Sequence, residues 1–132
     1  MKFRLSVLFI IIIGLVFYPG CKTTEECTFD ITGAWTLNLI ITDYGTETLT
    51  MTFTGSTSSG TVYGFGTHVA TYTVTDCNTV QLILDFWGSG CHLLYTWDGT
   101  STSDTVMNGT FVATNSCETT TLSGTWSATK IL

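Results

Sequence analysis

The chain has 132 residues, with ten acidic side chains against four basic ones and a formal net charge of −6. This length suits one small domain. An acidic chain with so few cations is repelled by phosphates, so we expect no nucleic-acid partner.

The N-terminal segment has the pattern of a secretory signal peptide. Lys2 and Arg4 precede an apolar run over residues 5–18, which Pro19 and Gly20 end. A helix of this length rises about 21 Å, less than the ~30 Å hydrocarbon core of a membrane. The alternative, a retained membrane span, usually needs about 20 apolar residues. Residues 1–20 are therefore predicted to be a cleaved signal.

The stretch from Tyr18 to Cys21 resembles a bacterial lipobox, in which a small residue precedes a cysteine that is lipidated. Gly20 and Cys21 fit this pattern, whereas Tyr18 and Pro19 replace aliphatic or small residues. The resemblance implies that Cys21 carries lipid chains such as palmitate, which anchor the protein stably in a membrane. Residues 21–30 would form the lipidated tether. Because Lys22 is not Asp, the resemblance favours the outer membrane, on its periplasmic face or at the cell surface.

Residues 31–132 are predicted to form an all-β domain. They are rich in threonine and aromatic residues, which suit strands, and several stretches alternate between apolar and polar residues. Eight strands are expected, over residues 33–42, 46–55, 61–65, 68–75, 79–87, 91–98, 105–114 and 119–130.

One break between strands is uncertain, because residues 64–66 could form a turn or a kink in a single longer strand. Eight strands in a meander would let the first strand pair antiparallel with the last and close a barrel. Seven would leave open edges, which proteins avoid.

Four cysteines remain besides Cys21, an even number in an oxidising compartment. In the eight-strand arrangement Cys27 and Cys77 lie at one end, and Cys91 and Cys117 lie at the other. The predicted disulfides are Cys27–Cys77 and Cys91–Cys117. A Cys77–Cys91 bridge is disfavoured, because the strand between these residues spans about 30 Å.

Two glycine–tryptophan motifs open the first predicted strand and occupy the last: Gly33-Ala34-Trp35 and Gly124-Thr125-Trp126. The first resembles the calycin group, the lipocalins and avidin-like barrels, where such a tryptophan packs at one barrel end. The resemblance implies an eight-stranded antiparallel up-and-down β-barrel and binding of a small apolar molecule. Lipocalins place an arginine over this tryptophan, and Lys130 is the only candidate to take its place here.

The period-two pattern predicts seven large aromatic side chains inside the barrel: Trp35, Phe53, Tyr72, Phe86, Tyr95, Trp97 and Trp126. An eight-stranded barrel is either filled by such side chains or holds one small ligand. If a ligand binds, the candidate residues are Trp35, Tyr72, Phe86, Tyr95, Trp97 and Trp126. Ile83, Trp87 and Leu94 are expected to point outward, where they would suit a partner protein or the membrane surface.

No combination of residues indicates catalysis. Asp85 and Asp98 are too far apart along their predicted hairpin to act as an acid–base pair. His68 and His92 are expected about 10 Å apart on one rim, where a metal or polar-ligand site is a minor alternative. The sequence therefore predicts a lipid-anchored, non-catalytic envelope lipoprotein without cofactor or metal that binds a small apolar ligand. The alternative is a filled barrel that acts as a structural or protein-interaction module.

Overall fold

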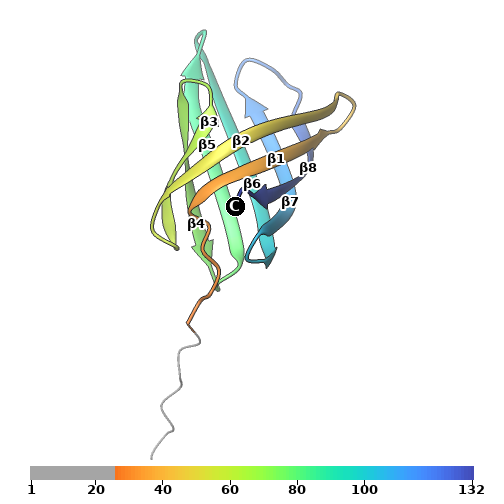
Figure 1. Ribbon diagram of the computed structural model, residues 1–132. Coiled ribbons are helices and arrows are strands. Elements are labelled where there is room, and N and C mark those ends of the chain that lie inside the picture. The colour runs from red at the N-terminus through yellow and green to blue at the C-terminus, as the bar shows by residue number, and fades with distance from the viewer. Residues whose placement is uncertain (1–25) are drawn as a thin grey trace, which may run out of the picture.

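The computed structural model describes residues 26–132; the predicted signal peptide and Cys21 lie outside this range. Eight antiparallel strands form a closed barrel in sequential order, which confirms the predicted fold (Figure 1). The strands are β1 (Gly33–Ile41), β2 (Gly45–Gly55), β3 (Ser59–Phe65), β4 (His68–Thr75), β5 (Thr79–Gly88), β6 (Cys91–Ser103), β7 (Val106–Asn115) and β8 (Leu122–Lys130).

The barrel closes because β1 pairs antiparallel with both β2 and β8. Leu37, for example, faces Leu49 on one side and Ala128 on the other. Buried positions recur at every second residue, as in the run Trp35, Leu37 and Leu39 of β1, because successive side chains of a strand point to opposite faces. One face of every strand therefore contributes to a single interior.

The uncertain break at residues 64–66 is a turn, so the eight-strand alternative is correct. Gly66 has a φ of 66° and joins β3 to β4 with Thr67. A β-bulge precedes the turn, between Val62 and Phe65. Gly64 lies in this bulge with a φ of 132°, and a Cβ there would come within 2.4 Å of the Thr50 carbonyl oxygen. The chain is therefore bent twice here: β3 is kinked by the bulge at Gly64, and the turn at Gly66 then reverses its direction.

Most strand boundaries lie within two residues of the prediction, and two differ by more. β6 extends to Ser103 instead of residue 98, because Gly99 and Thr100 pair with Gly109 and Asn108 of β7. Its glycine-, serine- and threonine-rich end has the composition of a loop but the pairing of a strand. β8 begins only at Leu122 and not at residue 119, because the preceding residues remain in a loop.

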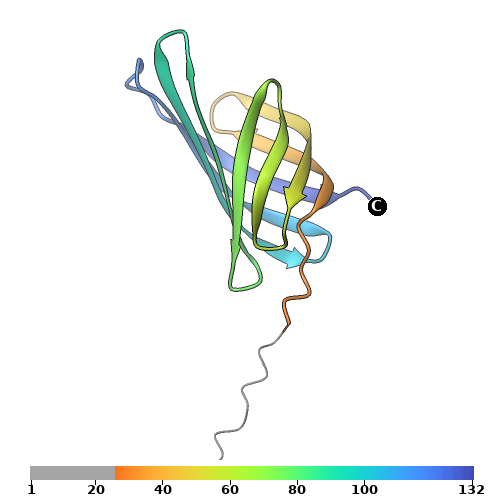
Figure 2. The ribbon, with the colours of Figure 1, turned by 90° about the vertical axis from the view of Figure 1, so that its left-hand side faces the viewer.

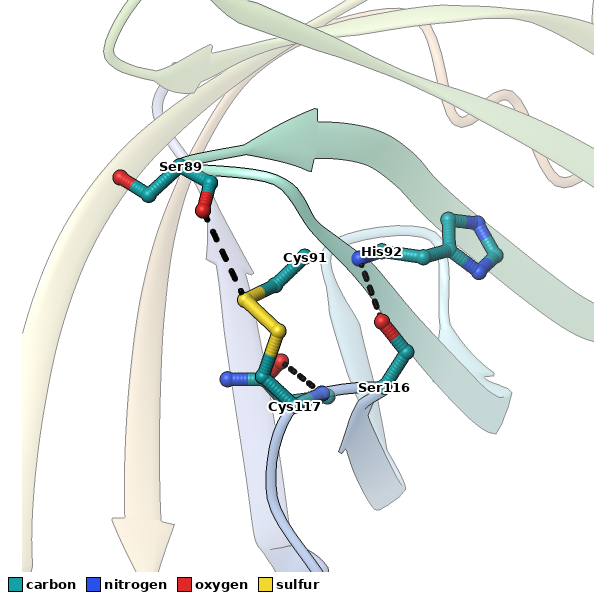
Figure 3. The surroundings of a disulfide bond; sticks show 6 residues. Ser89, Cys91, His92, Ser116 and Cys117 are labelled. Carbon is teal, nitrogen blue, oxygen red and sulfur yellow. Dashed lines mark hydrogen bonds between the residues drawn. A yellow bond between two sulfur atoms is a disulfide. The ribbon is translucent and has the colours of Figure 1, made fainter.

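Both predicted disulfides are confirmed, with Cα–Cα distances of 5.0 Å for Cys27–Cys77 and 5.5 Å for Cys91–Cys117. Figure 3 shows the second, which joins the start of β6 to the loop after β7. Beside it, the backbone N–H of His92 donates a hydrogen bond of 2.8 Å to the hydroxyl of Ser116. The β5–β6 hairpin and the β7–β8 loop are therefore fixed to one another.

The two ends of the barrel are distinct. The tether end carries the β2–β3, β4–β5 and β6–β7 turns, and residues 26–32 enter there. The open end carries the other four loops, including the β5–β6 hairpin, which extends away from the N-terminal segment (Figures 1 and 2). One disulfide lies at each end, because Cys77 is in the β4–β5 turn and Cys91 follows the β5–β6 turn.

Candidate functional site: the open end of the barrel

The barrel interior at the tether end is filled by aromatic side chains, and a space of about 310 Å³ remains there beside the Cys27–Cys77 disulfide and the end of β6. Phe29, Trp35, Phe53 and Tyr72 form an edge-to-face chain with successive ring centroids 6.3, 6.3 and 5.3 Å apart. The Trp35 indole N–H donates a 2.7 Å hydrogen bond to the carbonyl of Ile31, which is itself fully buried. Trp35 and Tyr72, two of the predicted ligand-binding residues, thus belong to a solid plug. Phe29, in the predicted tether, is part of it.

Trp126 is also held in the packed interior. Its N–H donates a 3.0 Å hydrogen bond to the Thr110 carbonyl, and the residue is 3% exposed. Its ring lies against the backbone of β6, so that a Cβ on Gly99 would come within 2.4 Å of the indole. Trp126 is therefore part of the packed interior and does not line the cavities at the open end.

The open end is hollow. A cavity of about 200 Å³ lies between strands β1 to β6, with Phe65 at the end of β3 as part of its lining. Three predicted ligand-binding residues, Phe86, Tyr95 and Trp97, line it. The full lining comprises Leu39, Glu47, Leu49, Phe65, His68, Leu84, Phe86, Tyr95 and Trp97.

Nearly parallel rings form one wall of this cavity. His68 stacks on Phe86 at 3.8 Å, Phe86 on Tyr95 at 6.4 Å, and Tyr95 on Trp97 at 5.6 Å between ring centroids. Phe65 lies 5.2 Å from Trp97. Such a ladder of rings offers apolar surface with defined geometry, which suits a flat apolar ligand.

Trp97 has a buried N–H without a hydrogen-bond partner among residues 26–132, although the residue is only 3% exposed. The indoles of Trp35 and Trp126, by contrast, both donate to backbone carbonyls. A buried donor without an acceptor costs free energy, and such groups are rare in folded proteins. The nitrogen itself is inaccessible to solvent, so an acceptor atom of a molecule in the cavity reaches this donor only if the indole shifts.

A second cavity of about 390 Å³ lies on the other side of Tyr95 and Glu47, which line both spaces. Its walls come from β1, β2, β6, β7 and β8 and from the β1–β2 and β7–β8 loops. Ile41, Leu93 and Leu122 supply its apolar part, and Glu118 lies at its polar side. The two cavities thus lie next to each other at the open end, with Glu47 and Tyr95 between them. We call this part of the barrel its mouth.

Glu47 is the site residue that the sequence analysis missed. It lies in β2 directly opposite Leu39, with Leu49, Met51 and Phe53 following on the same face of the strand. Its carboxylate is exposed and borders both cavities. The alternating pattern extends from Leu49 back to Glu47, so the same periodicity that predicted the core could have identified it.

The two histidines do not form a common site. His68 stacks on Phe86 at the inner face, whereas His92 stacks on Trp87 at 5.1 Å and contacts the Asp85 carboxylate. Phe86 and Trp87 are successive residues of β5 and point to opposite faces. Both histidines thus lie at the open end, but they stack on residues that point to opposite faces of β5.

The acidic residues Asp85 and Asp98 have separate partners. Asp98 accepts a hydrogen bond of 2.8 Å from Gln81, while Asp85 contacts His92. Within residues 26–132, no three His, Cys, Asp or Glu side chains are grouped so as to hold a metal ion. The arrangement at the open end thus offers apolar surface and single polar groups rather than a set of ligands.

The outer face of β5 and β6 carries the apolar residues that were expected there. Trp87 is 71% exposed, Ile83 is 37% exposed and Leu94 is partly buried. They project from the side of the barrel, since Ile83 and Trp87 alternate with the inward Leu82, Leu84 and Phe86. This surface is separate from the cavities.

Comparisons with protein-family models, with curated proteins and with solved structures give no match to this chain. In the part of the chain that the structure describes, no helix has the length and apolar character needed to cross a membrane. The functional interpretation therefore depends on the geometry of the barrel itself.

Proposed function

We propose that the protein is a non-catalytic binding protein that holds one small apolar molecule in the open end of its barrel. The observation that carries this proposal is Trp97, whose buried N–H has no acceptor among the described residues while its ring lines an aromatic cavity. The ligand has a flat apolar body and one acceptor atom, such as a carbonyl or ether oxygen. An enzyme site would need an activated nucleophile or a hydrogen-bonded proton-transfer pair. Glu47 and His68 both line the cavity, but no hydrogen bond joins them in the described part of the chain.

The proposal includes a lipid anchor at Cys21 in the outer membrane. Its support is the sequence: two basic residues, a short apolar run and the Gly20-Cys21 pair. Residues 26–32 enter at the tether end, where Cys27 is fixed to Cys77, so both cavities lie at the opposite end from the point where this segment joins the barrel. The mouth of the barrel would then face away from the membrane and remain open to ligand.

Detergent partition tests the anchor. The full chain should enter the detergent phase of Triton X-114, and the Cys21→Ser variant should remain in the aqueous phase. Mass spectrometry of the N-terminal peptide should show acyl chains on Cys21. A wild-type protein that stays in the aqueous phase would exclude lipid anchoring but would leave the binding site untouched.

Ligand binding is tested with Prodan, a neutral fluorophore that has a flat ring system and a carbonyl acceptor. The mature chain is exported with a conventional secretory signal and Cys21→Ser, so that no micelle competes for the probe. We expect saturable binding of one Prodan per chain. Trp97→Phe should weaken binding about fivefold, as expected for one net hydrogen bond of about 1 kcal/mol.

Trp87→Phe is the matched control, because Trp87 is exposed on the outer face. This variant should bind Prodan as wild type does. The competing proposal is a structural or interaction module that binds an envelope protein through the outer face of β5 and β6, and the exposure of Trp87 and Ile83 favours it. An absence of saturable Prodan binding would overturn the ligand proposal and leave the interaction module.

A further inference from the structure

We infer that the cavity at the open end selects a cationic ligand, an amine attached to a flat apolar body, and rejects anions such as fatty acids. This inference rests on the proposed function and specifies the chemical class of its ligand. It depends on three features of the described residues: the position of Glu47, the aromatic faces beside it, and the absence of a lysine or arginine at the mouth.

The positions of the lysine and arginine side chains disfavour an anionic ligand. Lys130 is the only lysine or arginine within residues 26–132. It is held at the tether end, where its Nζ donates a 2.7 Å hydrogen bond to the Asp30 carbonyl and lies over Trp35. A carboxylate or phosphate at the open end would therefore lose hydration without gaining a lysine or arginine partner.

Glu47 supplies a negative charge, which is complementary to a cationic ligand. It borders both cavities, so its carboxylate can contact a ligand in either one. Glu118 adds a second acidic side chain at the larger cavity. An ammonium group attracted to these carboxylates would also lie close to Tyr95, which lines both spaces. Cations are attracted to aromatic faces, and this attraction strengthens as the site loses water.

The ligand thus contacts polar groups at two places. Its acceptor atom approaches the Trp97 N–H in the interior, and its ammonium group remains near Glu47 at the mouth. The apolar body lies between them, beside Phe86 and Tyr95. This order places the charge in the wetter part of the site, where its desolvation cost is smallest.

The test uses three methoxynaphthalenes that carry an aminomethyl, a hydroxymethyl or a carboxylate group. The methoxy oxygen of each compound is an acceptor for Trp97, and the compounds differ only in the group that faces Glu47. Affinities are measured by calorimetry at low salt and about pH 8, where histidine side chains are ordinarily neutral. We expect the amine to bind about fivefold more tightly than the alcohol, from a Coulomb attraction of about 1 kcal/mol at contact in water. The carboxylate should bind most weakly.

Glu47→Gln should reduce the preference for the amine, with Glu118 as the remaining carboxylate, and should weaken binding of the amine more than binding of the alcohol. Asp104→Asn is the matched control, because it removes the same charge from the exposed β6–β7 turn at the tether end. This variant should retain the preference. Equal binding of all three compounds, or tightest binding of the carboxylate, would overturn the inference while preserving a ligand site. If none binds, the proposed function itself fails.

Discussion

The ammonium group of Lys130 lies over the indole of Trp35, 5.6 Å from the ring centroid, and donates a 2.7 Å hydrogen bond to the Asp30 carbonyl. The two residues face each other across β1 and β8. Lys130 therefore joins three parts of the chain at the tether end: the first strand, the last strand and the segment before β1.

We expect Lys130→Met to lower the free energy of unfolding by about 1 kcal/mol, since a partly exposed cation–π contact contributes about this much. Urea denaturation followed by tryptophan fluorescence measures the change. Lys130→Arg keeps the cation and should recover most of the loss. If Met and Arg at this position give the same stability, the charge contributes nothing and only the alkyl chain matters.

The carboxylate of Asp30 should make the free energy of unfolding depend on pH. The Thr32 hydroxyl and N–H donate hydrogen bonds of 2.7 and 2.9 Å to its carboxylate. These bonds, and more weakly the charge of Lys130, lower the pKa of Asp30 below its ordinary 3.8. The pKa is lower in the folded state than in the unfolded chain, so this contribution is present above about pH 4 and is lost as the pH falls through the folded-state pKa.

Asp30→Asn should therefore be less stable than wild type at neutral pH, and the difference should shrink as the pH approaches about 2. Urea midpoints measured across this range test the expectation. Thr32→Ala removes one donor and raises the pKa of Asp30 toward its ordinary value, so it should show a smaller version of the same trend. A difference that stays constant with pH would mean that Asp30 acts only through packing.

Much of the fold could be predicted because the signals are local and consistent. In β2, threonines alternate with Leu49, Met51 and Phe53, which is the pattern of a strand with one buried face. The ends of the strands were harder to predict. The sequence Gly99-Thr100-Ser101 has the composition of a loop, yet it is part of β6 because β7 supplies a partner for each residue. Such pairing depends on the whole barrel and is not visible in one segment.

The site was only partly predictable for a related reason. Periodicity indicates whether a side chain points inward, but not whether it lies in the plug or at the mouth. Trp35 and Trp97 share the interior, yet Trp35 is packed by the segment before β1 while Trp97 borders a cavity. Glu47 went unnoticed because a charged residue at an inward position contradicts the expectation of a core. At a barrel end it is tolerated, since water reaches it.

Gly109 should resist substitution because two strands approach closely there. It pairs with Gly99 on β6 and with Trp126 on β8. A Cβ on Gly109 would lie 2.0 Å from the Asp98 carbonyl oxygen, so the β6–β7 pairing would have to shift. We expect Gly109→Ala to cost about 1–3 kcal/mol, as overpacking does in cores.

Gly88→Ala is the control for Gly109→Ala, because a Cβ at Gly88 meets only ordinary contacts at 3.6 Å and beyond. This variant should unfold within about 0.5 kcal/mol of wild type, as substitutions at unstrained surface sites do. Chemical denaturation of both variants gives the comparison. Equal stability of the two would show that the strands can separate at Gly109 without loss.

The two disulfides should differ in their effect on binding. The Cys91–Cys117 bridge holds the loop after β7, whose residues Glu118, Thr120 and Thr121 line the larger cavity. Replacing both cysteines by serine should lower the free energy of unfolding by about 3.5 kcal/mol, from the entropy of a 26-residue loop. Ligand affinity should fall as well, because the loop would no longer be fixed at the mouth.

The Cys27–Cys77 bridge is the matched comparison. It closes a longer loop, with a sequence separation of 50, so its removal should cost about 4 kcal/mol by the same reasoning. It lies at the tether end, away from both cavities, and its double serine variant should bind Prodan with wild-type affinity while it remains folded. Guanidinium denaturation and Prodan titration are measured on each variant. If the Cys27–Cys77 variant loses binding while folded and the Cys91–Cys117 variant keeps it, the ligand site is not at the open end.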